Sequence, residues 1–214
     1  MYESFHLNHE RYYYGGEETA DWLIGLLERH IKLDDKCILD WGCGPARVIR
    51  HFPKLTANKC HYFGTDYNKK SIEWNTKNIE NVKFNHNSLK AELPYESGFF
   101  DVIYGISIFT HLSEKMHYEW FNELKRIIKN DGLLLLTMQG ENFKQKLSEQ
   151  EKDKFDNGEL VIRGNVKEGH RIYSAFHPDK FLEDLFSEMQ VLEKIIKSPD
   201  GKSYIPQDTW ILKK

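Results

Sequence analysis

The stretch Cys37–Arg47 combines an acidic residue with glycines at a spacing that could hold a small ligand. It reads CILDWGCGPAR, so Asp40 ends an apolar run and Gly42 and Gly44 follow it. Glycines here let the backbone turn sharply and let a ligand lie directly against it. A carboxylate at this place would repel a pyrophosphate but accept hydrogen bonds from a cationic or amine-bearing ligand. Two glycines alone would fit an ordinary turn, and the acidic residue favours a ligand site.

Asp66 is a second candidate ligand-binding position, because it directly follows the apolar run Tyr62–Thr65. An acidic side chain at the end of a strand can accept hydrogen bonds from both hydroxyls of a ribose. The ribose of an adenosyl group and that of a nicotinamide cofactor would be bound alike, so Asp66 alone does not separate the two. An aspartate after a strand can also simply cap the next helix.

His111 follows the apolar run Val102–Ile106 by a few residues and is a candidate general base. Histidine has a reference pKa of about 6.5, which suits proton transfer near neutral pH. The same position would let His111 order the loop before the next helix, and both interpretations stay open. None of the 10 histidines stands at a metal-ligand spacing, so no metal site is predicted.

Short apolar runs alternate with helical patterns along the chain. The predicted strands are nearly continuous apolar runs, typical of strands buried on both faces: Cys37–Leu39, Tyr62–Thr65, Val102–Ile106 and Leu133–Met138. The predicted helices cover about 17–32, 45–53, 69–80 and 114–129. Parallel strands need crossover connections, so this alternation predicts an α/β, doubly wound fold.

The ends of the helices and the region after residue 140 are also predicted. Ser113 is placed to begin the 114–129 helix and Asn130–Gly132 to end it. After residue 140 the pattern predicts a polar helix to about Phe155 and then a two-stranded excursion through Leu160–Arg163 and Arg171–Phe176. A helix begun by Pro178 follows. The last two predicted strands, Val191–Ile196 and Thr209–Leu212, are separated by a turn at Asp200 and Gly201. The 156–175 excursion is interpreted as an insertion.

Length and composition limit the class of protein. The chain has 214 residues, of which 40% are hydrophobic and 14% aromatic, which suits one domain with a core and excludes a disordered chain. Its formal net charge of -3 disfavours a nucleic-acid partner, and its apolar runs are too short to cross a bilayer. Three cysteines without CxxC spacing and a start without a secretory signal predict free thiols and a cytoplasmic location.

With these elements in order, the chain resembles the class I S-adenosylmethionine-dependent methyltransferases. Their acidic-x-Gly-x-Gly-x-Gly loop is matched by Asp40, Gly42 and Gly44, with Ala46 in place of the third glycine. The resemblance covers roughly residues 20–140 and implies a mostly parallel, seven-stranded Rossmann-like sheet with S-adenosylmethionine as cofactor. The segments 44–51, 66–68 and 107–112 resemble a bacterial branch that is associated with small-molecule or glycan modification.

The resemblance also implies a set of cofactor-binding residues. These are Asp40, Gly42, Cys43, Gly44, Arg47, Asp66, Tyr67, Asn87, Ser88 and Ile106. In this interpretation Tyr67 lies beside the adenine, Asn87 and Ser88 contact its edge, and Arg47 pairs with the cofactor carboxylate. Many family members have an aspartate where Asn87 stands, and the amide oxygen can still accept one hydrogen bond from the adenine amino group.

The acceptor is predicted to be a small or glycan-like molecule that is methylated on oxygen, with His111 as the base. The sequence after Val102–Ile106 lacks the motifs of adenine, glutamine and cytosine methyltransferases and the acidic cluster of magnesium-dependent catechol enzymes. The candidate substrate residues are Tyr14, His170, Tyr173 and His177. Tyr12–Gly16 is interpreted as an aromatic, then flexible lead-in to the first helix, so that residues 1–16 could form a lid or simply pack in the core.

Other functions stay open at this point. A nicotinamide-dependent oxidoreductase would share the fold, but its G-x-G-x-x-G turn places a glycine where Arg47 stands. A non-catalytic protein could keep the S-adenosylmethionine pocket without turnover. RNA and protein acceptors are further alternatives, because Arg47, Arg50, His51 and Lys54 form a local cationic cluster. The oligomeric state is not predicted.

Overall fold

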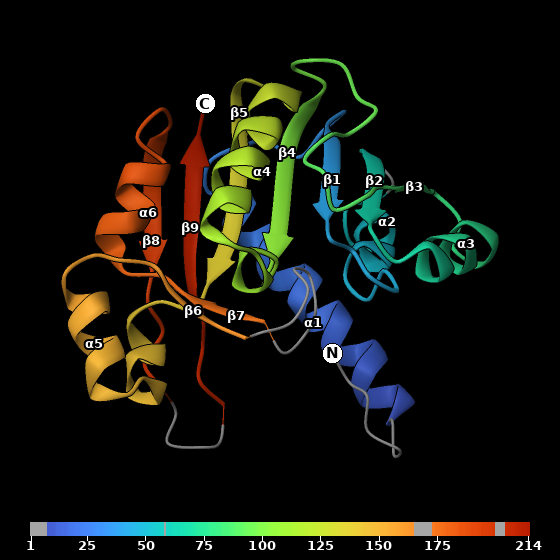
Figure 1. Ribbon diagram of the computed structural model, residues 1–214. Coiled ribbons are helices and arrows are strands. Elements are labelled where there is room, and N and C mark those ends of the chain that lie inside the picture. The colour runs from blue at the N-terminus through green and yellow to red at the C-terminus, as the bar shows by residue number, and fades with distance from the viewer. Residues whose placement is uncertain (1–7, 58, 165–172, 200–203) are drawn as a thin grey trace.

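A seven-stranded sheet forms the centre of the protein (Figure 1). The computed structural model describes residues 8–57, 59–164, 173–199 and 204–214. The strands, in spatial order, are β3 (Val82–His86), β2 (His61–Asp66), β1 (Cys37–Trp41), β4 (Phe100–Ile106), β5 (Ile128–Met138), β9 (Asp208–Lys213) and β8 (Gln190–Ile195). The first five pair in parallel, whereas β9 runs antiparallel to both β5 and β8. The expected doubly wound, mostly parallel sheet is confirmed.

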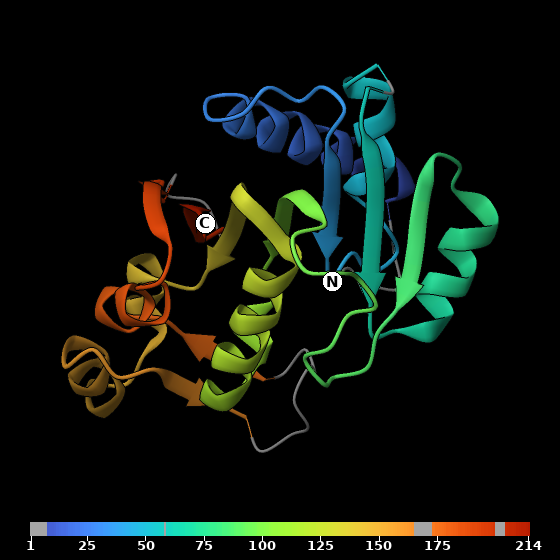
Figure 2. The same ribbon diagram turned by 90° about the horizontal axis from the view of Figure 1, so that it is seen from above.

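Helices cover both faces of this sheet (Figure 2). One face carries α1 (His9–Leu27), α2 (Phe52–Leu55) and α3 (Lys69–Asn78), and the other carries α4 (Glu114–Ile127) and α6 (Asp179–Leu185). Successive strand residues point to opposite faces. Ile38 therefore packs with the α1 side, whereas its neighbour Leu39 packs with the α4 side. This burial on both faces explains the continuous apolar runs of the strands.

The first helix begins earlier than the sequence pattern predicted. Asn8 caps α1, because its side chain accepts a hydrogen bond from the Arg11 N–H at 2.9 Å. The segment Tyr12–Gly16, expected as a flexible lead-in, is therefore helical, and that prediction was wrong. A Cβ atom on Gly16 would overlap the carbonyl oxygen of Arg47, so this glycine permits close packing of α1 on the loop after β1.

Two further helix predictions need correction. The expected 45–53 helix is instead a turn followed by the 3-10 turn Ile49–His51 and the short α2. Ser113 does cap α4, but α4 ends at Ile127 and β5 starts at once, well before Asn130–Gly132. The chain becomes extended there because Ile128 is fully buried and already pairs with Phe100 in the sheet.

The region after β5 adds a small second sheet. A 3-10 segment (Glu141–Lys146) and α5 (Glu149–Asp156) precede β6 (Val161–Arg163), which pairs antiparallel with β7 (Ser174–Phe176). The predicted two-stranded excursion is confirmed in its described part, and Pro178 begins α6 as expected. The predicted turn at Asp200 and Gly201 lies outside the described residues.

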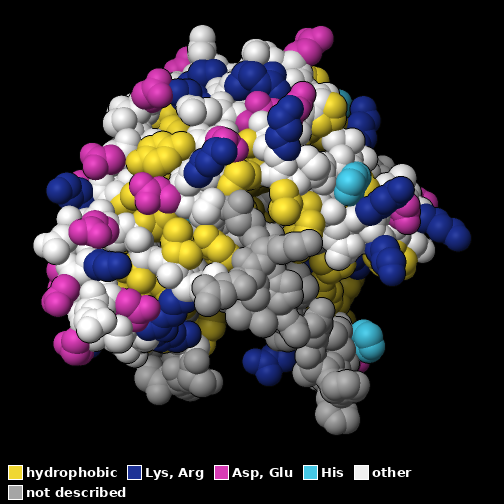
Figure 3. Space-filling model, viewed as in Figure 1, with side chains coloured by type: hydrophobic (Ala, Val, Ile, Leu, Met, Phe, Trp, Pro, Cys, Tyr) yellow, Lys and Arg dark blue, Asp and Glu magenta, His cyan; other side chains and the backbone are white. Residues whose placement is uncertain are grey.

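The surface carries both signs of charge. On the face seen in Figure 3, lysines and arginines are interspersed with aspartates and glutamates. No helix among the described residues is long and apolar enough to cross a membrane. The three cysteines are free thiols, as expected.

Candidate functional site

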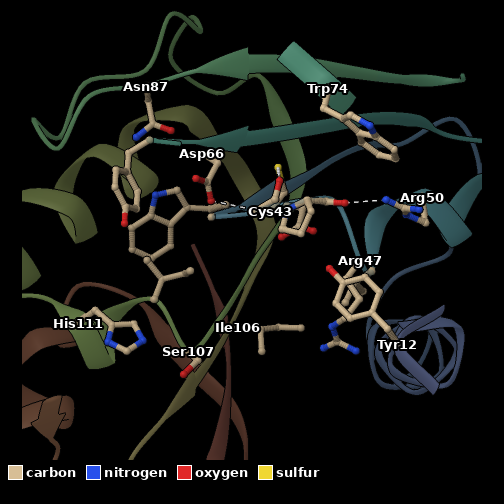
Figure 4. A pocket seen from close by; sticks show the side chains of 18 of the residues that line it. Tyr12, Cys43, Arg47, Arg50, Asp66, Trp74, Asn87, Ile106, Ser107 and His111 are labelled. Carbon is tan, nitrogen blue, oxygen red and sulfur yellow. Dashed lines mark hydrogen bonds between the residues drawn. The ribbon is translucent and has the colours of Figure 1, made fainter. Parts of the chain in front are cut away.

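A cavity of about 1170 Å³ opens at the carboxyl ends of β1, β2 and β4. All ten residues that the resemblance implied for the cofactor line it, and so do His111 and Tyr14. Figure 4 shows Asn87 and His111 on one side of this cavity, Asp66 and Cys43 between, and Arg50 and Trp74 on the opposite side. The structure therefore brings together residues that lie more than seventy positions apart in sequence.

The loop after β1 is fixed by backbone hydrogen bonds to the end of β2. The N–H groups of Gly42 and Cys43 donate to the Thr65 carbonyl at 2.8 and 2.9 Å. Gly42 has a φ of +77°, and a Cβ atom there would overlap the side chain of Ile108. Both the left-handed conformation and the close approach thus require glycine at this position.

Ala46 stands where the methyltransferase loop usually has its third glycine. It is fully buried, and its φ of +55° lies in the left-handed region. The backbone there keeps the conformation that a glycine favours although a methyl group is present. The alanine is therefore compatible with the left-handed turn at this position.

Asp66 is oriented by two backbone donors. Its Oδ2 accepts from the Gly44 N–H at 2.8 Å, and its Oδ1 accepts from the Asn68 N–H at 2.7 Å. The carboxylate is nearly buried and borders the cavity. Each carboxylate oxygen can accept more than one hydrogen bond, so the group retains capacity to accept from a pair of ligand hydroxyls.

Asn87 is held by its neighbours in a defined orientation. The Thr65 hydroxyl donates to the Asn87 amide oxygen at 2.7 Å, and the Asn87 Nδ2 donates to the Ser88 carbonyl at 2.7 Å. An amide oxygen has two lone pairs. Asn87 can therefore still accept one hydrogen bond from a ligand amino group, which is the capacity expected of it.

Asp40 lies under the loop, and burial raises its pKa to about 7. The neighbouring Asp66 carboxylate adds to this rise, and the Arg47 guanidinium opposes it. A buried carboxyl group prefers its neutral form because burial disfavours charge. A cationic group of a bound ligand would shift Asp40 toward its ionised form.

Arg47 is anchored on α1. Its Nη1 donates to the Gly15 carbonyl at 3.0 Å and lies 3.4 Å from the Thr19 hydroxyl. Both partners are neutral, and no carboxylate of the described residues forms an ion pair with Arg47. The guanidinium borders the cavity, so its positive charge is available to a ligand carboxylate.

His111 ends the 3-10 turn Phe109–His111, and its Nδ1 lies 2.8 Å from the Tyr173 carbonyl oxygen. A carbonyl oxygen only accepts, so Nδ1 carries the ring proton and Nε2 is the basic nitrogen of the neutral ring. The residue directly before β7 thus orients His111 through its backbone carbonyl. The Tyr173 side chain itself is buried and does not line the cavity, contrary to its predicted contact with substrate.

His177 does not reach the cavity either, and its predicted contact with substrate needs correction. It is fully buried, and its Nε2 lies 2.9 Å from the Nε2 of His117, whose Nδ1 lies 2.7 Å from the Ser113 carbonyl. Burial holds the pKa of His177 well below its usual value, and His117 adds to this effect. This pair ties α4 to the segment between β7 and α6. The remaining candidate, His170, lies outside the described residues.

Several lining residues were not identified from the sequence. They include Trp41, Trp74, Leu89, Ser107, Ile108 and Trp120. Ser107 has a φ of +61°, its N–H donates to the Thr137 hydroxyl at 2.9 Å, and its own hydroxyl accepts from Gln207 Nε2 at 2.8 Å. Its place directly after a strand was the only local signal, because its partners lie far along the chain.

Comparisons with known proteins agree with this geometry. Residues 38–132 match the family model described as a methyltransferase domain. This segment runs from β1 into the start of β5 and includes most of the residues that line the cavity.

Solved structures share the fold at low sequence identity. An S-adenosylmethionine-dependent methyltransferase from Methanosarcina mazei is similar with a TM-score of 0.65 and 17% identity, covering 88% of this chain and 96% of that chain. The 1,6-didemethyltoxoflavin-N1-methyltransferase of Burkholderia thailandensis, with bound S-adenosylhomocysteine, has a TM-score of 0.63 and 12% identity, covering 95% and 78%. The magnesium protoporphyrin IX methyltransferase of Synechocystis, also with bound S-adenosylhomocysteine, has a TM-score of 0.63 and 14% identity, covering 98% and 88%. Residues 38–132 therefore match a methyltransferase domain, and the chain has the fold of S-adenosylmethionine-dependent methyltransferases.

Proposed function

We propose that residues 1–214 act as one domain that transfers a methyl group from S-adenosylmethionine to a hydroxyl of a small-molecule or glycan-like acceptor. The observation that carries this proposal is the position of His111, with its basic Nε2, in the same cavity as the loop after β1. Two of the structural neighbours are named for small-molecule substrates, 1,6-didemethyltoxoflavin and magnesium protoporphyrin IX, which supports an acceptor of this size.

The cavity residues suit the cofactor group by group. Asp66 would accept from the ribose hydroxyls, Asn87 and Ser88 would contact the adenine edge beside Tyr67, and Arg47 would pair with the carboxylate. Asp40 would face the cationic part of the cofactor. S-adenosylmethionine supplies a methyl group that its sulfonium already activates, so the chain mainly needs to align the nucleophile behind it.

His111 would remove the proton from the acceptor hydroxyl. Its Nε2 takes the proton, while Nδ1 continues to donate to the Tyr173 carbonyl. That carbonyl stabilises the positive charge of the doubly protonated ring and keeps it oriented. A base positioned in this way contributes a factor of about 100 or more to the rate.

The experiment compares wild type with His111→Ala. Each protein is incubated with S-adenosylmethionine and a small-molecule extract, and mass spectrometry detects the gain of one CH₂ unit together with S-adenosylhomocysteine. We expect His111→Ala to lower turnover by about 100-fold or more while S-adenosylhomocysteine binds with unchanged affinity. His61→Ala, which alters an exposed histidine at the start of β2, is the matched control. Full turnover by His111→Ala would remove the assignment.

A further inference from the structure

Ser107 lines the cavity in a backbone conformation that serine seldom adopts. Its φ is +61°, in the left-handed region, and it lies between Ile106 and His111 (Figure 4). Such a conformation persists where the surrounding structure holds it in place. Ser107 is also the point at which the chain leaves β4 and enters the turn that carries His111. The contacts that hold Ser107 therefore also determine how the chain reaches His111.

A closed cycle of three hydrogen bonds holds Ser107 from later parts of the chain. The Ser107 N–H donates to the Thr137 hydroxyl at 2.9 Å, and that hydroxyl donates to the Gln207 amide oxygen at 2.7 Å. The Gln207 Nε2 donates back to the Ser107 hydroxyl at 2.8 Å. A backbone N–H can only donate, so the single Thr137 proton goes to Gln207 and the direction of every bond in the cycle is fixed. We call these three residues the Ser107 clamp.

Thr110 ties the same serine to the turn itself. The Thr110 hydroxyl donates to the Ser107 carbonyl at 2.7 Å, and the two hydroxyl oxygens lie 3.1 Å apart. Since the only hydroxyl proton of Thr110 goes to that carbonyl, the Ser107 hydroxyl donates across the 3.1 Å contact. The next residue is His111, whose N–H donates to the Ile108 carbonyl at 3.0 Å. A continuous chain of hydrogen bonds therefore connects Gln207, through Ser107, to the turn that carries His111.

The other two members of the clamp are held by the sheet. Thr137 is buried in β5, which pairs with β4 on one side and with β9 on the other. Gln207 directly precedes β9, whose first residue, Asp208, is buried and pairs with Met138. Both positions are therefore set by strand pairing, which allows them to impose a strained conformation on Ser107. Both also lie beyond residues 38–132, the segment that matches the methyltransferase family model.

We propose that Gln207 and Thr137 are positioning residues, which place His111 by holding Ser107 in its left-handed conformation. The clamp fixes the backbone that leads to His111, whereas the Tyr173 carbonyl orients the ring of His111. Loss of either contact would leave the ring in the cavity but no longer in one orientation. This inference rests on the proposed function, because the orientation of His111 affects turnover only if His111 acts as the base.

The first test follows the ring nitrogens of His111 by heteronuclear NMR of the full chain at about pH 8, where a histidine ring is neutral. Comparison with His111→Ala assigns the signals. In wild type we expect one tautomer, protonated at Nδ1, because that nitrogen faces the Tyr173 carbonyl. Gln207→Leu and the isosteric Thr137→Val should each give a mixture of tautomers, whereas Thr137→Ser, which keeps the hydroxyl, should match wild type. Unchanged signals in either of the first two variants, or a mixture already in wild type, would overturn the proposal.

The second test measures turnover of the small-molecule extract at varied concentrations of S-adenosylmethionine. Gln207→Leu should lower the apparent kcat about tenfold or more, while KM for S-adenosylmethionine and the affinity for S-adenosylhomocysteine stay nearly unchanged. Gln190→Leu, which alters an exposed glutamine in β8, is the matched control and should change nothing.

A second substitution tests the role of the Ser107 backbone. Adding Ser107→Gly to Gln207→Leu should recover part of the lost turnover, because glycine adopts a positive φ without steric cost. A loss confined to cofactor affinity, or no recovery by Ser107→Gly, would contradict the role given to the clamp. Absence of turnover in wild type would instead contradict the proposed function, and the NMR comparison would still decide what orients His111.

Discussion

Two regions border the same cavity but are built differently. The glycine loop after β1 is fixed to the neighbouring strand β2 by its backbone N–H groups: those of Gly42 and Cys43 donate to the Thr65 carbonyl, and that of Gly44 donates to the Asp66 carboxylate. The second region, which we call the histidine wall, comprises His111, which lines the cavity, and the buried His117–His177 pair, which does not. It is held by segments that are remote in sequence, since His111 Nδ1 lies 2.8 Å from the Tyr173 carbonyl oxygen and His117 Nε2 lies 2.9 Å from His177 Nε2. Local backbone geometry therefore shapes one region, whereas long-range packing of side chains shapes the other.

The largest expected effect tests whether backbone conformation determines the shape of the glycine loop. Gly42→Ala combines a left-handed φ with overlap on Ile108, so the free energy of unfolding should fall by roughly 2–5 kcal/mol in urea denaturation. Gly44→Ala is the matched control. It shares a positive φ but meets no atom within 4 Å, so its cost should be only about 1–2 kcal/mol. Equal costs for the two variants would contradict this explanation.

The difference between local and long-range contacts also explains which parts of the fold and the site could be predicted from the sequence. The pattern of Asp40, Gly42 and Gly44 is local, and all ten residues that it and the family resemblance implied do lie in one cavity. The strands were predicted because burial on both faces leaves a continuous apolar run. The sequence pattern placed the start of α1 too late, because Gly15 and Gly16 suggested a flexible segment. The helix in fact continues through both glycines from its cap at Asn8.

The histidine wall could not be predicted in the same way. His177 was expected to contact substrate because it is polar and lies close to an insertion, but it packs on His117, sixty positions earlier in the chain. The role of Tyr173 lies in its carbonyl oxygen, which any residue possesses. Arg50 and Trp74 meet only because α3 lies against the glycine loop. No local pattern encodes these contacts.

A second prediction concerns the pH sensitivity of the histidine wall. The folded-state pKa of His177 is well below 6.5, so the unfolded chain binds a proton that the folded protein does not. Stability should therefore be fully present above about pH 6.5 and be lost as the pH falls below it, by up to about 1.4 kcal/mol per pH unit. Urea denaturation from pH 8 to pH 5 measures this slope. His177→Phe should flatten it, and an unchanged slope would show that other groups cause it.

A third prediction concerns Asp40 in the glycine-loop region. Its pKa of about 7 means that it binds a proton below neutral pH, and a cationic cofactor favours its ionised form. Affinity for S-adenosylmethionine should hold above pH 7 and weaken as the pH falls below 7, by up to about tenfold per pH unit. Binding heats in buffers of different ionisation enthalpy should show proton release near pH 7. If Asp40→Asn keeps the same pH dependence, Asp40 is not the group responsible.

The most direct test is a calorimetric titration of the wild-type protein with S-adenosylmethionine and, in parallel, with NADH. The central claim is that the cavity beside the glycine loop holds the methyl donor. Saturable binding of S-adenosylmethionine at one site, with no comparable response to NADH, is the result we expect. Tight binding of NADH without any response to S-adenosylmethionine would contradict the claim.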